Sequence, residues 1–318
     1  MGSNGLVVVT GASGHLGASL VRGLVAAGHT VRCVVRRDVR ALDGVPVQQV
    51  PGDVLDADSL CVAFRGADIV YHLAAVISLS GDRDGRVARV NVEGTRNVLE
   101  ACRVARVGRL VQFGSVHAAW TGDVGARGLT AYDRSKAASL DLVAAAVAGG
   151  LDAVVVHPSS VLGPHDFKPS RQGDLVWRLA NGRLPALLQG GFDWVDSRDV
   201  AAGAIAAAER GRPGATYVLS GRYATLRELA DIVATVAGVP APRLAAPLAL
   251  AAIGAPFVEA WGRITGTEPL YNRESLSALR HGRAFPHDEA AADLGYAPRP
   301  LEATVADTIA WFRSRAAG

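Results

Sequence analysis

Strand-like and helical stretches alternate through the first half of the chain, and this alternation restricts the possible folds more than any other feature. The strand-like runs are short and almost continuously apolar, so both of their faces need cover. Helices between consecutive parallel strands provide that cover. The sequence therefore predicts an α/β fold with a doubly wound parallel sheet. The predicted strands are 6–10, 30–36, 47–53, 68–75, 109–115 and 152–158, and the predicted helices are about 15–28, 56–65, 86–106 and 130–148.

The alternation weakens after about residue 162, which indicates a second, smaller α/β domain. Residues 163–174 look like a loop, a strand-like run at 216–221 precedes a helical stretch at 225–238, and a last helix is expected at 301–316. We expect the two domains to be interwoven. The larger domain would cover 1–162 with returning segments at about 192–222, and the smaller would cover 163–191 and 223–318.

An apolar stretch at residues 244–261 is interrupted by Pro247 and Pro256. It falls short of the roughly 18 uninterrupted apolar residues that a membrane-spanning helix needs. We predict a buried helix, or one that caps a bound substrate, and favour either over membrane contact.

Composition excludes several classes of partner. The 33 basic residues nearly balance the 30 acidic ones, so neither nucleic acid nor an anionic membrane is expected as a partner. The three cysteines, Cys33, Cys61 and Cys102, are odd in number and widely spaced, which favours free thiols in a reducing compartment. With no signal-peptide pattern at the start of the chain, we expect a cytoplasmic protein. The dispersed histidines predict no metal site.

The segment TGASGHLG places Gly11, Gly14 and Gly17 between the first predicted strand and the first predicted helix. Glycines at such a turn allow the backbone to approach a pyrophosphate, which the amides at the helix N-terminus bind. A glycine triplet is a weak signal alone, but its strand–turn–helix context favours a dinucleotide site.

Two positions downstream address the choice of dinucleotide. The second strand ends at Arg36, where such folds carry either an acid for the ribose hydroxyl or an arginine for a 2′-phosphate. Arg36 therefore favours NADP(H), although NAD(H) stays open. Asp53 ends the third strand, at the edge where adenine is expected; its alternative role is a helix N-cap, for which Asp56 is better placed.

Tyr132 and Lys136 lie four residues apart in a predicted helix and therefore share one face. Because the chain has only six tyrosines and two lysines, a chance pair is improbable. A nearby ammonium favours the tyrosinate and is expected to lower the phenol pKa, which suits a general acid or base. Ser115, at the end of the 109–115 strand, is placed to bind a substrate oxygen.

Taken in order, these motifs resemble the extended short-chain dehydrogenase/reductase family, within the NAD-dependent epimerase/dehydratase superfamily. YHLAA at 71–75, NVEGT at 91–95 and HPSSVLGP at 157–164 belong to the same resemblance. Further segments resemble the branch of dihydroflavonol reductases and 3β-hydroxysteroid dehydrogenases, namely TVRCVVRRD, NVEGTRNVLEAC and DLGYAPRPLEATVADTIAWF. The resemblance covers essentially the whole chain and implies a Rossmann-type sheet.

The resemblance implies a role for each matching residue. Tyr132 would transfer a proton, Lys136 would lower its pKa and hold the nicotinamide ribose, Ser115 would orient the reacting oxygen, and Asn91 would organise the active-site helix or a relay water. The implied cofactor-binding set is Gly11, Ser13, Gly14, His15, Leu16, Gly17, Arg36, Asp53, Val54, Leu73, Ala74, Ala75, Asn91, Tyr132, Lys136, Pro158, Ser159, Ser160 and Val161. The substrate candidates are Val76, His117, His165 and Phe167.

Some positions depart from the family pattern. Gly114 stands where many members have serine or threonine, which should matter little while Ser115 keeps its hydroxyl. Leu162 replaces the commoner tyrosine and puts one nicotinamide-side contact in doubt. His117 would face either substrate or core.

The combined expectation is an NADP(H)-dependent oxidoreductase that interconverts a carbonyl and a secondary alcohol on a small, apolar substrate. A nucleotide-sugar epimerase or dehydratase is the alternative enzyme, and Arg171, Arg178, Arg183 and Arg243 would then clamp a diphosphate. A non-catalytic dinucleotide sensor is a third possibility, which the complete Ser–Tyr–Lys set disfavours. The predicted partner is a small-molecule substrate, with a homodimer left open. Loops at about 76–86, 163–195 and 244–285 would select that substrate.

Overall fold

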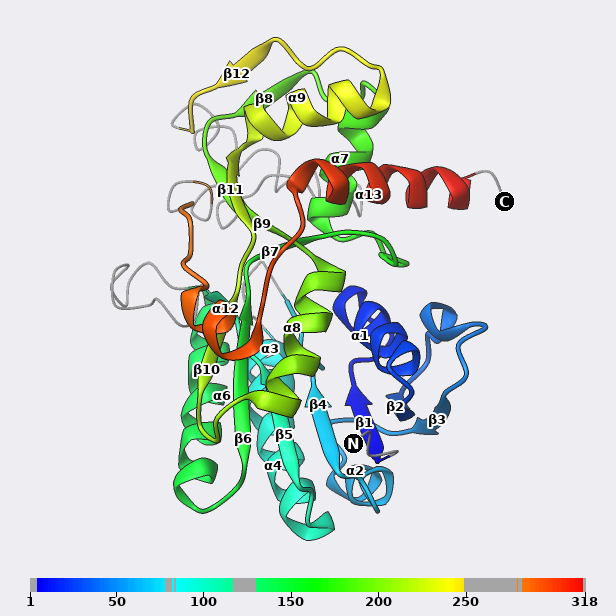
Figure 1. The fold of residues 1–318 in the computed structure, drawn as a ribbon, viewed down its shortest axis with the longest axis vertical. Coiled ribbons are helices and arrows are strands. Elements are labelled where there is room, and N and C mark those ends of the chain that lie inside the picture. Colours follow the sequence, from blue (N-terminus) through cyan, green and yellow to red (C-terminus); the bar gives the residue numbers. More distant parts are fainter. Residues whose placement is uncertain are drawn as a thin grey trace.

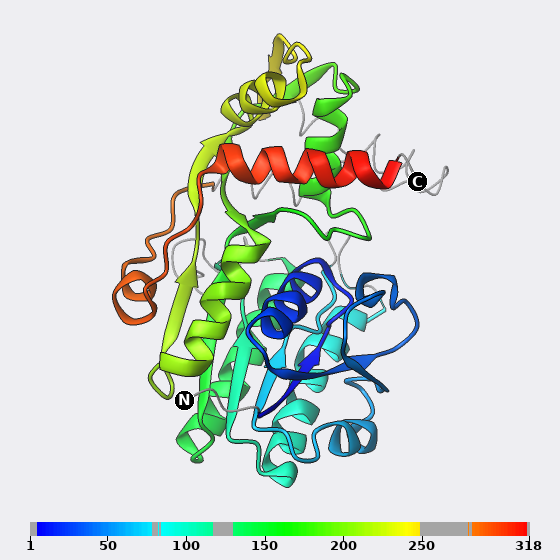
Figure 2. The ribbon, with the colours of Figure 1, turned by 45° about the vertical axis from the view of Figure 1, so that its right-hand side comes forward.

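The computed structural model describes residues 5–77, 82, 84–116, 130–248, 279 and 282–316. Figures 1 and 2 show a large sheet with helices on both faces and a second unit beyond the carboxyl ends of its strands. Within the described ranges, no helix combines the length and apolar character that a membrane crossing requires.

The main sheet has seven parallel strands in the order β10-β6-β5-β4-β1-β2-β3. The order reverses beside β1, which creates the crevice where doubly wound sheets bind ligands. The predicted doubly wound parallel sheet is therefore confirmed. The strands are β1 (Leu6–Thr10), β2 (Thr30–Val35), β3 (Gln48–Pro51), β4 (Ile69–His72), β5 (Arg109–Phe113), β6 (Ala153–Pro158) and β10 (Thr216–Leu219).

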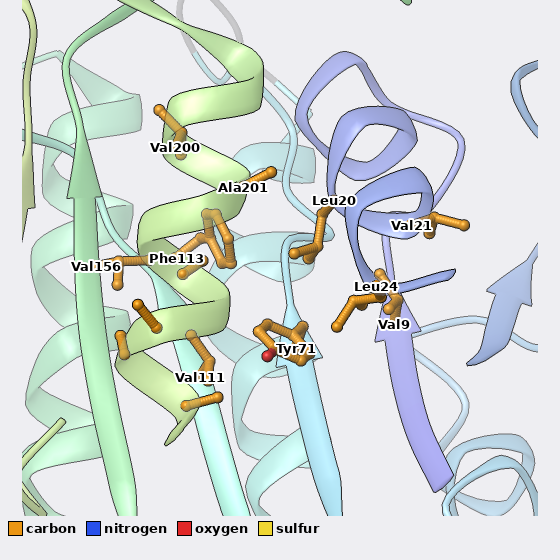
Figure 3. Close-up of a cluster of buried hydrophobic side chains, with 14 of the residues drawn as sticks. Val9, Leu20, Val21, Leu24, Tyr71, Val111, Phe113, Val156, Val200 and Ala201 are labelled. Atoms are coloured by element: carbon orange, nitrogen blue, oxygen red, sulfur yellow. The ribbon is translucent and has the colours of Figure 1, made fainter. Parts of the chain in front are cut away.

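Two layers of helices cover the main sheet. On one face, α1 (His15–Ala26) and α8 (Ser197–Arg210) pack side by side. Figure 3 shows the core beneath them, where Leu20 and Leu24 face Tyr71 and Phe113. The other face has its own core under α2 (Ala57–Ala63), α4 (Gly94–Ala105) and α6 (Ala131–Ala148). Side chains of alternate β1 residues pack into the two cores, as expected for a sheet that is buried on both faces.

The predicted helix at 86–106 is divided in the structure. It consists of α3 (Arg86–Ala88), a π-helical turn η2 (Arg89–Glu93) and α4. A short 3₁₀ turn, η1 (Arg40–Leu42), follows β2. The π-helical turn contains Asn91, and such turns frequently occur at functional sites.

The second unit is built on a three-stranded sheet in the order β11-β9-β7. Its strands are β7 (Ser160–Leu162), β9 (Gly191–Asp196) and β11 (Arg222–Thr225); β8 (Ala186–Leu188) and β12 (Leu244–Ala246) form a separate pair. Helices α7 (Arg171–Ala180), α9 (Leu226–Ala237) and α13 (Leu301–Ala316) share an apolar core with the three-stranded sheet. The short helix α12 (Asp288–Leu294) packs against α8 and β10.

Two local predictions differ from the structure. The segment expected to be a loop at 163–174 turns helical at Arg171, because the Ser170 hydroxyl caps α7 by accepting from the Gly173 amide. The predicted helix at 244–261 begins instead with β12. Its continuation from residue 249 lies outside the described residues.

Candidate functional site

The glycine turn after β1 forms a cradle at the N-terminus of α1. Gly11 has a positive φ of 73°, and a Cβ there would lie 2.6 Å from the Ala74 amide nitrogen, so only glycine fits. At Gly17 a Cβ would lie 2.8 Å from the Ala12 Cα, which brings α1 close to the turn. Gly14 is the N-cap of α1 and supplies no side-chain cap.

The uncapped start of α1 fits a pyrophosphate. No acidic residue occupies its first turn, so the amides there meet no competing carboxylate within α1. Ser13 and Gly14 are exposed, while His15 and Leu16 are partly buried. These observations agree with the predicted dinucleotide cradle.

The ends of β2 and β3 bring Arg36 and Asp53 together. The Arg36 Nη1 lies 3.6 Å from the Asp53 Oδ2, and both side chains are substantially exposed. Asp53 also accepts from the Leu55 amide, whereas Asp56 caps α2 as predicted. Asp53 is therefore not the helix cap, and Arg36 lies at the edge expected to bind adenosine.

Helix α6 presents Tyr132 and Lys136 from its first two turns. Thr130 and Asp133 form a reciprocal capping box that fixes where the helix begins. Lys136 is 5% exposed, and its Nζ donates to the Phe113 carbonyl oxygen at 2.8 Å. The Ser115 side chain lies close enough to the Tyr132 hydroxyl to lower its pKa. The structure thus brings the three predicted catalytic residues together at the carboxyl end of β5.

Burial dominates the protonation of this group. It raises the pKa of Tyr132, with a smaller contribution from Asp133, while the nearby Ser115 side chain acts in the opposite direction. Burial also lowers the pKa of Lys136 to about 8. The expectation that Lys136 lowers the Tyr132 pKa is therefore not met in this structure, because the ammonium points at the Phe113 carbonyl and desolvation outweighs its charge.

Ser115 lies in a turn that two buried side chains hold. We call residues 113–115 the Ser115 turn. Lys136 binds its first carbonyl, and the Ser115 amide donates to the His157 Nδ1 at 3.0 Å. His157 was not among the predicted site residues. Its position near the end of β6 could have indicated a place in the site, because β5 and β6 are parallel neighbours and their carboxyl ends lie side by side.

Asn91, on the π-helical turn, connects α6 to the segment after β4. Its Oδ1 accepts from the Val76 amide at 2.8 Å, and its Nδ2 donates to the Val76 carbonyl and to the Ser135 Oγ. Ser135 in turn donates to the Tyr132 carbonyl oxygen. The predicted organising role of Asn91 is consistent with these contacts, and Ser135 is a further participant that the sequence analysis missed.

The remaining predicted cofactor residues lie at or just after the carboxyl ends of β3, β4 and β6. Leu73 and Ala74 bind back to Thr10 at the end of β1, and Ala75 precedes the Val76 segment that Asn91 holds. Val54 packs against Gly94. Pro158 ends β6, Ser159 donates to the Asp193 carboxylate, and Ser160 and Val161 begin β7.

A buried histidine under this crevice was also overlooked. The His72 Nδ1 lies 2.7 Å from the Thr10 Oγ1, and its Nε2 lies 3.3 Å from the Thr95 Oγ1. Burial lowers the pKa of His72 to about 3, so the ring is neutral at physiological pH. It acts as an internal support for β1 and β4.

The three substrate candidates that the structure describes are not brought together. Val76 is held by Asn91, which also binds Ser135 on α6, whereas His165 and Phe167 lie on the α1 side of the main sheet. The Phe167 ring is 5.4 Å from Trp311 of α13, with the Arg22 guanidinium 5.5 Å from its centre. His165 lines a hollow of about 510 Å³ between α1 and α8. His117 lies outside the described residues.

No metal site accompanies this arrangement in the described part of the chain, where no three His, Cys, Asp or Glu side chains are grouped to hold an ion. The site combines a helix N-terminus suited to an anion with a Ser–Tyr–Lys group at the carboxyl edge of the sheet. Such an arrangement can hold a dinucleotide and exchange a proton with a substrate oxygen.

Comparison with known proteins agrees with this geometry. The model of the NAD dependent epimerase/dehydratase family matches residues 7–220. The sterol demethylase protein B of Methylococcus capsulatus is 36% identical over 325 residues, which cover 97% of this chain and 98% of that protein. A putative dihydroflavonol 4-reductase of Synechocystis is 32% identical, covering 96% and 94% of the two chains.

A solved structure, that of gox2253, is 33% identical and superposes with a TM-score of 0.83 over 98% of each chain. The resemblance to reductases of the extended short-chain type is confirmed by these matches, as is the prediction of an NAD(P)-dependent enzyme. The chain belongs to the NAD dependent epimerase/dehydratase family.

Proposed function

We propose that the protein is an NADP(H)-dependent oxidoreductase that interconverts a carbonyl and a secondary alcohol on a small, apolar substrate. The observation that carries the proposal is the convergence of three side chains at the carboxyl end of β5: the Ser115 side chain lies near the Tyr132 hydroxyl, and Lys136 is buried one turn along α6, where it binds the Phe113 carbonyl. This convergence supports roles for Tyr132 as the proton donor and for Ser115 as the group that binds the substrate oxygen. A relative named dihydroflavonol 4-reductase supports the same class of reaction.

Each residue of the group has a distinct task. The reduced nicotinamide, when bound, supplies a hydride to the carbonyl carbon. Tyr132, kept neutral by burial, donates its phenolic proton to the carbonyl oxygen, and Ser115 holds that oxygen by a hydrogen bond. Lys136, with a pKa of about 8, is largely protonated at neutral pH and can return a proton or bind a ribose hydroxyl.

The assignment of NADP(H) depends on Arg36. Its side chain is 58% exposed at the end of β2, and its guanidinium lies near Asp53. A planar, permanently charged group at this position suits a 2′-phosphate. NAD(H) is the alternative cofactor, since the family description names NAD.

An apolar substrate is supported by the segment that Asn91 holds. Ile77 follows Val76 directly and is 70% exposed, so an aliphatic side chain is open to a ligand next to the segment that Asn91 holds. The competing nucleotide-sugar reaction would need cations that clamp a diphosphate. Of the arginines considered for that task, Arg178 is already paired with Asp174 at 2.8 Å.

The test is a screen of NADPH oxidation against ketones, aldehydes and nucleotide sugars, with NADH as the cofactor control. We expect turnover of an apolar ketone or aldehyde and a preference for NADPH. Conversion of a nucleotide sugar without net NADPH oxidation would establish the epimerase or dehydratase alternative instead.

Tyr132→Phe separates catalysis from cofactor binding. The variant should lose at least about 100-fold in kcat, the low end of what general acid catalysis contributes, while it still folds and binds NADPH. Tyr223→Phe, on β11 of the second unit, removes the same hydroxyl elsewhere and should leave kcat unchanged. Wild-type turnover by Tyr132→Phe would rule out the proposed mechanism.

A further inference from the structure

The Ser115 turn has a buried partner on the neighbouring strand. His157 lies on β6, is 2% exposed, and accepts from the Ser115 amide through Nδ1 at 3.0 Å. The preceding amide, that of Gly114, donates to the Val156 carbonyl oxygen at 2.8 Å. The turn therefore continues the pairing of β5 with β6 through a side chain once the strand hydrogen bonds end.

Gly114 is shaped to this contact. A Cβ at position 114 would overlap the His157 imidazole at Nδ1 and Cε1. Glycine is thus required here by a close approach of the ring, and the absence of a side chain at 114 is not the neutral departure that sequence analysis suggested. The His157 ring of β6 occupies the space that a side chain at position 114 would fill.

The imidazole is held in one protonation state. Because the Ser115 amide is a donor, Nδ1 must carry a lone pair, and the ring proton resides on Nε2. Burial, together with the nearby Lys136 ammonium, lowers the pKa of His157 to about 4. At neutral pH the acceptor is therefore always present.

We propose that His157 is a positioning residue, which fixes the Ser115 turn so that the Ser115 hydroxyl meets the Tyr132 hydroxyl and the substrate oxygen. The inference rests on the proposed function. Ser115 is held at its amide by His157, and Phe113 is held at its carbonyl by Lys136. Loss of either contact frees one end of a three-residue turn, and a displacement of about 1 Å at a reacting group costs roughly 100-fold in rate.

Two substitutions of His157 separate positioning from packing. Asn places a carbonyl oxygen near the position of Nδ1 and can still accept from the Ser115 amide, whereas Leu fills the space without an acceptor. We expect His157→Leu to lower kcat about 10- to 100-fold with the NADPH Kd within about 2-fold of wild type. His157→Asn should stay within about 3-fold of the wild-type kcat.

His29→Leu is the matched control, because His29 lies in the turn between α1 and β2, remote from the Ser115 turn. It should leave kcat unchanged. Wild-type kcat for His157→Leu, or an equal loss for the Asn and Leu variants, would overturn the proposal.

Amide exchange tests the same contact without a substrate. The Ser115 amide should exchange with deuterium at least about 10-fold faster in His157→Leu than in wild type, and His157→Asn should restore protection. Equal exchange in all three proteins would also overturn the proposal. If wild-type protein reduces none of the screened carbonyls, the proposed function fails, and the exchange rates alone decide whether His157 holds Ser115.

The contact with Gly114 gives an independent cycle. Gly114→Ala should lower the urea midpoint of unfolding in the wild-type background and lower it by less than half as much in His157→Ala, where the ring is gone. Equal shifts in both backgrounds would show that the ring does not set the requirement for glycine.

Discussion

Burial opposes charge at two neighbouring side chains of the candidate site. Tyr132 and Lys136 lie on one face of α6, and the desolvation of each favours its neutral form. For Tyr132 this keeps a proton available for donation at neutral pH. For Lys136 it means that the charged form lowers the free energy of unfolding, and this effect can be measured.

We expect Lys136→Met to stabilise the fold at pH 7 while it abolishes turnover. The folded pKa of Lys136 is about 8, against its usual value of 10.5, so below pH 8 the folded protein carries the full penalty of a buried ammonium. A shift of this size corresponds to about 3 kcal/mol, and the Met variant leaves the Phe113 carbonyl without its donor, which costs about 1 kcal/mol. The net gain for the Met variant should be about 2 kcal/mol in urea unfolding.

The pH dependence gives the sign of this effect. Between pH 8 and 10.5 the folded protein releases a proton that the unfolded chain retains, so wild-type stability rises relative to Lys136→Met and the difference closes by about pH 10.5. Lys168, the other lysine, is exposed, and Lys168→Met should show no such trend. A Met variant at position 136 that is less stable than wild type at pH 7 would contradict the burial argument.

Arg36 offers a second test at the level of one residue. Arg36→Ala should weaken NADPH binding about 10-fold or more, because a charge-assisted contact is lost, and should leave NADH binding nearly unchanged. Arg40→Ala is the control, since the Arg40 guanidinium is already 2.7 Å from the Asp38 carboxylate. Fluorescence titration with both cofactors measures the difference. A wild-type preference for NADH, or no effect of the substitution on NADPH, would argue against the role assigned to Arg36.

Among the elements, α1 depends most on one close approach. Gly17 lies where the helix meets the turn that leads into it, with no room for a Cβ. Gly17→Ala should lower the free energy of unfolding by about 2–3 kcal/mol through overpacking, and should weaken NADPH binding because the cradle shifts.

Gly23 provides the comparison within the same helix. A Cβ there meets only the Ile205 Cδ1, the flexible end of a side chain, at 3.2 Å. Gly23→Ala should be neutral or up to about 1 kcal/mol stabilising, as alanine is the better helix former. Equal urea midpoints for the two variants would show that the approach at Gly17 is not limiting.

The elements also show how far sequence reasoning reaches. Six strands and the helices between them were predictable because apolar runs, the glycine turn and caps such as Asp56 are local signals. Helix α8 was not predicted, because its small alanine-rich face resembles no amphipathic pattern until α1 is packed against it. The start of α7 was missed for another reason, since its cap, Ser170, lies in a segment whose Gly, Pro and Asp residues are typical of a loop.

Within the site, the residues with chemical motifs were predictable and their supports were not. The sequence indicated Ser115, Tyr132 and Lys136, and these do converge. His157 and Ser135 act through contacts between elements distant in sequence, so no local spacing reveals them. The same limit applies to Phe167, whose aromatic partner comes from the last helix.

At the scale of the whole molecule, one buried carboxylate joins segments from three parts of the chain. Asp193 on β9 accepts from the Ser159 hydroxyl, the Gly221 amide and the Phe285 amide. These contacts link the end of the main sheet, the β10–β11 connection and the segment before α12. The two units are therefore tied by an acceptor that is 3% exposed.

Asp193→Ala should lower the free energy of unfolding by about 3 kcal/mol or more, because three buried donors lose their acceptor together. Asp231→Ala, an exposed substitution on α9, should change it by less than about 0.5 kcal/mol. Urea unfolding followed by both tryptophan fluorescence and circular dichroism measures the loss. A small effect at Asp193 would show that the units are held together by other contacts.

The chain passes several times between the main sheet and the second unit. The strands β7 and β9 of the second unit precede β10 of the main sheet in the sequence and are therefore synthesised first. On the ribosome, which adds residues from the N-terminus, the outermost strand of the large sheet emerges only after much of the other unit has been synthesised. Neither unit can finish folding before the other has begun. The nascent protein must therefore expose the unpaired edge of β6 until residue 219 has left the exit tunnel, which is the interval in which chaperones or aggregation would act.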